Sequence, residues 1–262
     1  MRRARQFALP LLSPRLIAVW RRNFLVWRKL AVPSILGNFA DPLIMLFGLG
    51  YGLGAVMGNV AGTSYFAFLA AGFAASATMY AATFEALFSA FSRMHVQKTW
   101  EAIVNAPMTL DDVLAGEWLW AASKALAAGL CMIAVISAFG YASYPLALAA
   151  LPVLVLAGLA FAALGLAVNA LASGYDFFSY YLTLVLTPMM MLSGVFFPVE
   201  QLPGPIQIVA AALPLHHAVQ LVRPLLSGVL PAAPLLHVAV LAGYAAVGFY
   251  VATVLTRRRL LS

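Results

Sequence analysis

Hydrophobic and ionisable positions fall into long separate blocks along this chain. No Asp, Glu, Lys or Arg occurs in residues 42–84, 125–175 or 224–256. A helix that crosses a membrane needs about 20 apolar residues, so each of the first two blocks can hold two such helices joined by a short loop, and the third can hold one. The apolar run between Asp176 and Pro198 adds another, which makes six predicted spans.

Composition supports this pattern. Hydrophobic residues make up 64% of the chain and charged residues 9%, whereas a soluble domain carries about 25% charged residues. The sequence therefore predicts an all-α membrane protein that forms one transmembrane domain, residues 1–262. Its six spans are expected at about 33–57, 64–91, 119–139, 146–171, 177–197 and 235–255.

An amphipathic helix is predicted before the first span, over residues 13–30. Ser13 is a good N-cap and Pro14 a good first helical residue. At 100° per residue, one face is apolar and the opposite face is basic, a pattern typical of a helix that lies along the inner membrane surface. The apolar face holds Leu16, Ile17, Trp20, Phe24 and Trp27, and the basic face holds Arg15, Arg22 and Lys29.

A charged segment, residues 92–117, separates the second and third spans, and we expect it to lie in water. A short amphipathic helix is predicted over residues 98–105 and ends before Pro107. Thr109 and Asp112 then have the spacing of a capping box, which predicts a new helix that enters the membrane. The segment thus predicts a rigid ridge that a soluble partner can contact.

Prolines interrupt residues 198–234 six times before Pro234 and leave apolar pieces of about 8 to 10 residues. Such pieces are too short to cross a membrane. They are typical of helices that dip into the outer leaflet and return, so we expect an outer re-entrant segment between the fifth and sixth spans.

The net charge of +7 follows the predicted topology. Eight of the fifteen Lys and Arg precede Val32, two lie in the charged segment and three end the chain at residues 257–259. With six spans and both termini inside the cell, these thirteen would all face the cytoplasm. Nucleic-acid binding would need a basic patch that this pattern lacks.

Three ionisable residues, Asp41, Glu85 and Lys124, are predicted at a similar depth on three different spans. Such groups are costly in a membrane unless they are paired or hydrated. They form either an ion-pair cluster that holds the helices together or a site that faces the substrate or switches between states. Met189, Met190 and Met191 likewise suit either a surface for variable apolar ligands or ordinary core packing.

Catalytic and cofactor motifs are missing. The sequence has no GxxxxGK[ST] phosphate loop and no HExxH metal motif, and Ser193 lacks the preceding glycine of an intramembrane serine protease. The adjacent His216 and His217 would point to different sides of a helix, and Cys131 is the only cysteine. We therefore expect neither catalysis nor a bound metal or cofactor on this chain.

Three segments together resemble the type-two ABC export permeases. They are TWEAIVNAPMTLDDVLAGEW (residues 99–118), LSGVFFPVEQLP (192–203) and PLHHAVQLVR (214–223). Residues 22–34, 37–43 and 47–54 are further similar to the beginning of the branch of that family that exports lipid-modified oligosaccharides. The resemblance covers nearly the whole chain.

The resemblance implies a permease in the bacterial inner membrane that works as two copies with two ATPase subunits, which bind ATP and Mg. The helix after residue 98 would then be a coupling helix, and the re-entrant segment would form an outer gate. An amphiphilic cargo is implied, such as a lipid-modified oligosaccharide, glycolipid, polysaccharide or hydrophobic drug. The implied sites are Lys98, Trp100, Glu101, Asn105 and Pro107 for the ATPase, with Trp100 as a packed anchor, and Phe196, Phe197, His217 and Arg223 for the gate.

Two other classes remain open at this point. A self-sufficient secondary transporter would need ion-coupling residues in its spans, and Asp41, Glu85 and Asp176 are the candidates. An integral-membrane enzyme is the third possibility, and the sequence offers no catalytic constellation for it.

Overall fold

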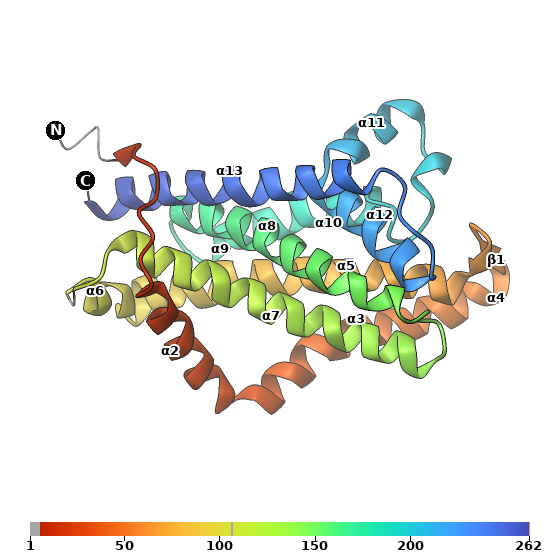
Figure 1. Ribbon diagram of the computed structural model, residues 1–262, viewed down its shortest axis with the longest axis horizontal. Coiled ribbons are helices and arrows are strands. Elements are labelled where there is room, and N and C mark those ends of the chain that lie inside the picture. Colours follow the sequence, from red (N-terminus) through yellow and green to blue (C-terminus); the bar gives the residue numbers. More distant parts are fainter. Residues whose placement is uncertain (1–5, 106, 262) are drawn as a thin grey trace.

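The fold is a bundle of long helices arranged around α5 (Figure 1). The structure is a computed structural model that describes residues 6–105 and 107–261, with the backbone alone for residues 35–39, 41, 104 and 261. Before the charged segment lie α2 (Leu16–Arg28), α3 (Ala31–Gly52), α4 (Gly54–Met57), the hairpin strands β1 (Asn59–Val60) and β2 (Thr63–Ser64), and α5 (Tyr65–Phe84). Two π-helical turns, η1 (Glu85–Ser89) and η2 (Ser92–Val96), extend α5.

The second half of the chain is helical as well. It holds α6 (Thr99–Val104), α7 (Leu110–Ala138), η3 (Leu146–Ala149), α8 (Ala150–Leu171), α9 (Asp176–Tyr181), η4 (Leu182–Leu186), α10 (Thr187–Leu192), η5 (Val199–Gln201), α11 (Gly204–Ala212), α12 (Pro214–Leu226) and α13 (Pro234–Leu261).

Four helical segments of the described chain are long and apolar enough to cross a membrane, judged by length and composition: Tyr65–Val96, Leu110–Ala138, Leu146–Leu171 and Pro234–Leu260. They correspond to the second, third, fourth and sixth predicted spans. Shorter apolar helices, Pro42–Met57 and Asp176–Leu192, occupy the first and fifth predicted positions. Helices α11 and α12, which form the predicted re-entrant segment, are bent by 87° and become a fifth span if counted as one.

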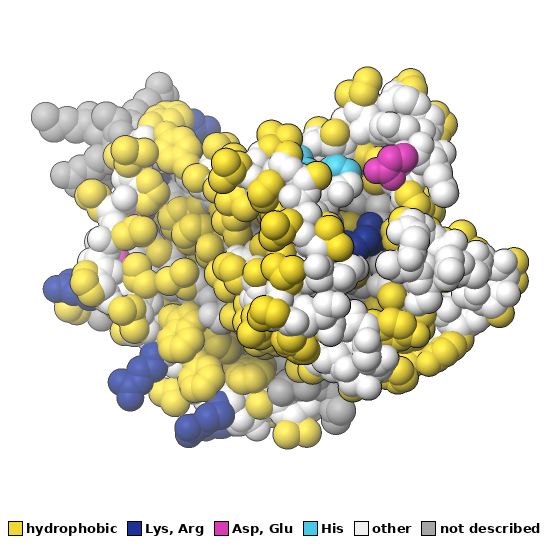
Figure 2. All heavy atoms as spheres, turned by 45° about the vertical axis from the view of Figure 1, so that its right-hand side comes forward, with side chains coloured by type: hydrophobic (Ala, Val, Ile, Leu, Met, Phe, Trp, Pro, Cys, Tyr) yellow, Lys and Arg dark blue, Asp and Glu magenta, His cyan; other side chains and the backbone are white. Residues whose placement is uncertain are grey.

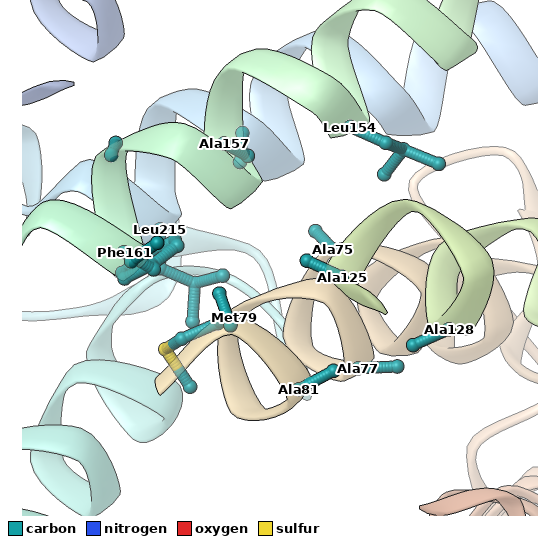
Figure 3. Packing of buried hydrophobic residues seen from close by; sticks show 14 of the residues in the cluster. Ala75, Ala77, Met79, Ala81, Ala125, Ala128, Leu154, Ala157, Phe161 and Leu215 are labelled. Atoms are coloured by element: carbon teal, nitrogen blue, oxygen red, sulfur yellow. The ribbon is translucent and has the colours of Figure 1, made fainter. Parts of the chain in front are cut away.

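Small side chains allow the central helices to pack closely. Alanines of α5 and α7 face each other, and Ala75 lies beside Ala125 in Figure 3, with Leu154 of α8 above them and Phe161 of α8 to their left. Nearly all of α5 is buried, so this helix is the centre of the core. Lipid tails are as apolar as the helix side chains, so the hydrophobic effect does not drive helices together inside a membrane. Close packing of small residues is a usual source of helix association there.

The two ends of the bundle differ. Helix α6, the N-terminal segment and the last turn of α13 lie together at one end, and the β1–β2 hairpin, α11 and α12 lie towards the other (Figure 1). Hydrophobic side chains cover most of the face in Figure 2, and Lys and Arg side chains gather at its left and lower left. This distribution is typical of a bundle that is embedded in lipid along its sides.

The second span is longer than predicted and takes up part of the charged segment. The segment Tyr65–Val96 has 32 residues, which at 1.5 Å per residue is about 48 Å and exceeds the hydrocarbon core of about 30 Å. A helix of this length must tilt in the bilayer or extend beyond its hydrocarbon core, and its last turn, η2, carries Arg93, which pairs with Glu117 of α7.

The expectation that the whole charged segment lies in water was wrong. Arg93, Asp111, Asp112 and Glu117 are mostly buried, and only Lys98 and Glu101 of its charged residues are exposed. The physical reason is that the buried charges are compensated by ion pairs and hydrogen bonds within the chain.

Candidate functional site

Helix α6 forms a short exposed ridge at one end of the bundle. Lys98 precedes it in the left-handed conformation, with φ of 50°, which turns the chain sharply after α5. Lys98, Glu101, Asn105 and Pro107 are all exposed. Four of the five residues predicted to contact an ATPase therefore lie at the surface of this ridge.

Trp100, the fifth, points into the chain. Its side chain is 2% exposed, and its Nε1 donates a hydrogen bond to Glu117 Oε1 at 3.2 Å. The structure thus differs from the predicted interface anchor, because the indole fills the space between α6 and α7. Its contact fixes the ridge to the long helix behind it.

Four charged side chains form a compact cluster beneath the ridge, which we call the charge hub: Glu85, Arg93, Glu117 and Lys124. Arg93 Nη2 lies 2.8 Å from Glu85 Oε1, and Arg93 Nε donates to Glu117 Oε1 at 2.8 Å. Lys124 Nζ lies 2.8 Å from Glu85 Oε2. Two negative and two positive charges therefore balance in a site where an unpaired charge is costly.

Two tryptophans complete the charge hub. Trp120 Nε1 donates to Glu85 Oε1 at 2.8 Å, while Trp100 donates to the other carboxylate. The hub therefore joins α5, α6 and α7 through both ion pairs and indole hydrogen bonds. The predicted neighbours Glu85 and Lys124 are brought together, and the side chain of Asp41 lies outside the described residues.

A cavity of about 280 Å³ opens beside the charge hub. Its walls include Ser34, Phe84, Phe88, Glu85 and Lys124. The hub is thus reached from the side of the bundle as well as from its end.

The π-helical turn η1 sets the direction of Glu85, its first residue. A π turn is a local departure from the regular α-helix and is frequent at functional sites. Asn169 of α8 holds this turn from the side, because its Nδ2 donates to the carbonyl oxygens of Ala86 and Leu87 at 2.8 and 3.2 Å. Gly165 permits this approach, since a Cβ there would lie 2.7 Å from Ala86 Cβ.

The first turn of α7 is tied to both chain ends. The predicted capping box is present: Asp112 N donates to Thr109 Oγ1, and Thr109 N donates to Asp112 Oδ2. Ser13 N donates to Asp112 Oδ1 at 2.7 Å. Asp111 pairs with Arg257 of α13. The N-terminal segment and α13 are therefore both fastened to the helix that follows the ridge.

Helix α2 packs across α7 at Gly116. A Cβ at this position would lie 2.5 Å from Val19 Cβ and 2.8 Å from the Leu16 carbonyl oxygen, so only glycine allows the crossing. The rings of Trp20, Phe24 and Trp27 contact Trp120. Much of the apolar face that was predicted to rest on the membrane therefore rests on the protein.

Arg22 links α2 to the ridge, because its Nη2 donates to Thr99 Oγ1 at 3.3 Å. Burial lowers the pKa of the Arg22 guanidinium from its ordinary value, and the nearby Glu117 carboxylate partly offsets this.

The predicted outer gate residues make separate contacts. Arg223 Nη2 donates to the Gly194 carbonyl oxygen at 2.6 Å, and its guanidinium lies 3.7 Å from the centre of the Phe68 ring. Phe196 contacts Phe73 edge to face. His217 bonds to His237 of α13, with 2.7 Å between their Nδ1 atoms. Phe197 is half-buried. Arg223 and Phe196 are thus joined to α5, and His217 to α13.

The methionines differ in exposure. Met189 and Met190 are buried, whereas Met191 is 38% exposed. Within the described residues, no group of three or more His, Cys, Asp and Glu side chains is placed to hold a metal ion.

Sequence reasoning missed the partners of Arg93, Asp111 and Asn169. A signal was available for the first: Arg93 lies in a segment that holds four acidic residues and only one other basic residue, Lys98, which favours ion pairing. For Asn169 the only signal was a lone amide in an apolar span, where a polar side chain needs a partner.

The chain belongs to the ABC-2 type transporter family, whose family model matches residues 14–226. Over 258 residues it is 50% identical to nodulation protein J of Rhizobium meliloti (strain 1021), which covers 97% of both chains. It is 52% identical over 245 residues to nodulation protein J of Rhizobium leguminosarum bv. viciae, covering 94% of this chain and 95% of that protein. The family indicated by the sequence motifs is thereby confirmed, and so is the likeness to the nodulation protein J branch.

Proposed function

We propose that this chain is the membrane-spanning permease subunit of an ATP-driven exporter. Two copies would form the export path, and two separate ATPase chains would bind ATP and Mg. The observation that carries this proposal is the exposed ridge α6, which is joined to α7 through Trp100 and, through the charge hub, to the extension of α5. A partner that pushes on the ridge would therefore move α5 and α7 directly.

The proposed orientation places α6 and both chain ends in the cytoplasm, with six spans in the inner membrane. The fourteen Lys and Arg on or near that side support it, because positive residues favour the cytoplasmic face. Helices α11 and α12 would then lie at the outer face, where Phe196, Phe197, His217 and Arg223 would close the path. Their contacts with α5 and α13 support such a gate.

An amphiphilic cargo suits this arrangement. Met191, the exposed one of the three methionines, would offer its path adaptable apolar surface, with Met189 and Met190 packed behind it. The relatives are named for nodulation, and the resemblance to their branch leads us to favour a lipid-modified oligosaccharide over a glycolipid, a polysaccharide or a hydrophobic drug.

A self-sufficient secondary transporter is supported less well. Of its candidate residues, Glu85 is already paired with two cations, and Asp176 is exposed at the start of α9.

The test is to purify the chain with its ATPase, reconstitute both in vesicles and compare Glu101→Arg with Glu200→Arg. Both residues are exposed, and the two lie on opposite ends of the bundle, so the charge change is matched. We expect Glu101→Arg to lower ATP-dependent transport at least about tenfold, equivalent to about 1.4 kcal/mol, and Glu200→Arg to stay within about twofold. Equal effects, or transport driven by an ion gradient with no ATPase present, would refute the proposal.

A further inference from the structure

Helix α2 carries positive charge that the rest of the chain leaves largely uncompensated. It holds Arg21, Arg22 and Arg28 and no acidic residue. Within the described residues, Arg21 makes no ion pair or hydrogen bond, and its side chain is exposed. An exposed guanidinium is well suited to bind a phosphate, because its planar fork of N–H donors matches the phosphate oxygens.

Two hollows meet on this helix. The first, which we call the basic hollow, measures about 560 Å³ and is lined by Pro14, Ile17, Ala18, Arg21, Arg22 and Leu25. The second, which we call the acyl groove, measures about 290 Å³ and lies between α2, α7 and α8. Its walls include Leu16, Ile17, Trp20, Leu126, Val155 and Leu159.

Ile17 lines both hollows, so the two hollows adjoin along one side of α2. Ile17 is 58% exposed and Val155 36% exposed, so the acyl groove reaches the surface of the bundle. Among the residues that the structure describes, no Asp or Glu lines either hollow. A ligand that fits must therefore combine a negative head with an apolar chain.

We propose that the basic hollow and the acyl groove together bind one anionic phospholipid of the inner leaflet. Its phosphate lies against Arg21 and Arg22, and an acyl chain enters the groove beside Trp20. Both parts contribute, because basic side chains attract anionic lipid and buried methylene groups add apolar contact. Since Arg22 also donates to Thr99, the bound head would adjoin the ridge α6.

The experiment uses the full chain, freed of lipid in detergent and titrated with dioleoyl phosphatidylglycerol or dioleoyl phosphatidylcholine. Native mass spectrometry counts the lipid that each protein retains. The two lipids share their acyl chains, so the difference between them reports the charge of the head. Inorganic phosphate at the same concentrations serves as a third arm, and we expect it to displace little lipid because it lacks the chains.

Arg21→Gln tests whether Arg21 binds the negatively charged head group of the lipid, and Arg28→Gln is its matched control. Arg28 lies seven residues along the same helix, about 10 Å away at 1.5 Å per residue, and lines neither hollow. Losing one basic contact should weaken phosphatidylglycerol binding about fivefold for Arg21→Gln and leave it within about twofold for Arg28→Gln. Equal weakening would mean that charge attracts lipid to the whole helix, and the single site would be refuted.

Val155→Trp tests whether a lipid acyl chain binds in the acyl groove, because the larger side chain fills the groove. Leu148→Trp adds the same side chain at an exposed position outside the groove. Only Val155→Trp should reduce retention of both lipids. A second measurement needs no substitution in the groove: acyl-brominated phosphatidylglycerol should quench tryptophan fluorescence more than its phosphatidylcholine counterpart, because Trp20 lines the groove. The proposal is overturned if the two lipids bind and quench equally, or if phosphate alone displaces them.

Discussion

Arg257 and Asp111 form a buried ion pair that joins the last helix to the first turn of α7. Arg257 Nε donates to Asp111 Oδ1 at 2.9 Å, and the side chains are 9% and 8% exposed. The same carboxylate accepts a hydrogen bond from Leu11 N at 3.0 Å, and the same guanidinium donates to the Ala8 carbonyl oxygen. The N-terminal segment, α7 and α13 therefore meet at one pair of charges directly behind the ridge α6.

Removing one partner of this pair should destabilise the protein strongly. Arg257→Met leaves the Asp111 carboxylate buried without its cation, which costs about 3 kcal/mol. We expect that loss in the free energy of unfolding, measured by titration with sodium dodecyl sulfate. The double variant Arg257→Met with Asp111→Leu should recover much of it, because no buried charge is then left alone.

Arg258→Met is the control for this prediction. Arg258 is the next residue, is exposed, and contacts the ring of Phe7 through its guanidinium. We expect a change below about 1 kcal/mol. If Arg257→Met and Arg258→Met prove equally mild, the pair contributes little to the fold.

Substitutions at the centre of the charge hub should lower the free energy of unfolding more than substitutions at its edge. Glu117 accepts hydrogen bonds from Arg93 and Trp100, whereas Lys124 contacts Glu85 alone and is 17% exposed. Glu117→Gln should therefore lower the free energy of unfolding by about 2–3 kcal/mol. Lys124→Met should cost less than about 1 kcal/mol, because Glu85 keeps Arg93 and can gain water from the adjoining cavity.

Transport measurements should show a second difference between the two hub variants. Because Trp100 fixes the ridge to Glu117, we expect Glu117→Gln to lower the amount of cargo moved per ATP hydrolysed in vesicles, at a temperature where the variant stays folded. Lys124→Met should keep the wild-type ratio. A normal ratio in both variants would argue that the hub stabilises the helices without transmitting movement.

Asn169 should be needed for the π turn next to Glu85. Asn169→Leu keeps the size of the side chain but removes both hydrogen bonds to the α5 extension, and each such hydrogen bond contributes about 0.5–1.5 kcal/mol. Thr253→Val is a suitable comparison, because Thr253 is also buried and its hydroxyl bonds only to Phe249 of its own helix. We expect a clear loss of thermal stability in detergent for Asn169→Leu and a much smaller one for Thr253→Val.

Much of the architecture could be predicted from hydrophobic blocks and breaker residues. The fourth span was expected at 146–171, and the structure has a helical segment at Leu146–Leu171 that is long and apolar enough to cross a membrane, because a charge-free run bounded by turns leaves little choice. Thr109 and Asp112 likewise predicted the start of α7, since a capping box acts through neighbouring residues. Local signals of this kind do not depend on the rest of the fold.

The pairing of charges could not be predicted in the same way. Asp111 and Arg257 are far apart in sequence, and only the packing of α7 against α13 brings them together. Trp100 was predicted as a packed anchor against an ATPase, whereas its indole packs within the chain and bonds to Glu117, a neighbour that the local sequence does not reveal. The π turns at Glu85 and Arg93 leave no periodic signal in an apolar helix, so the direction of these side chains required the structure.

Gly116 should be irreplaceable because α2 crosses α7 there. A Cβ from Gly116→Ala would meet Val19 and the Leu16 carbonyl oxygen at 2.5 and 2.8 Å, and overpacking of this kind costs about 1–3 kcal/mol. Gly243→Ala is the opposite case, since nothing lies within 4 Å of a Cβ there and alanine favours a helix by up to about 1 kcal/mol over glycine. We therefore expect opposite shifts in the unfolding midpoint in detergent. Gly116→Ala should cost less beside Val19→Gly than beside Val19, because Val19→Gly removes the Cβ and Cγ1 atoms that the new Cβ would meet at 2.5 and 2.9 Å. An equal cost in both backgrounds, or a loss at Gly243 as well, would contradict the crossing.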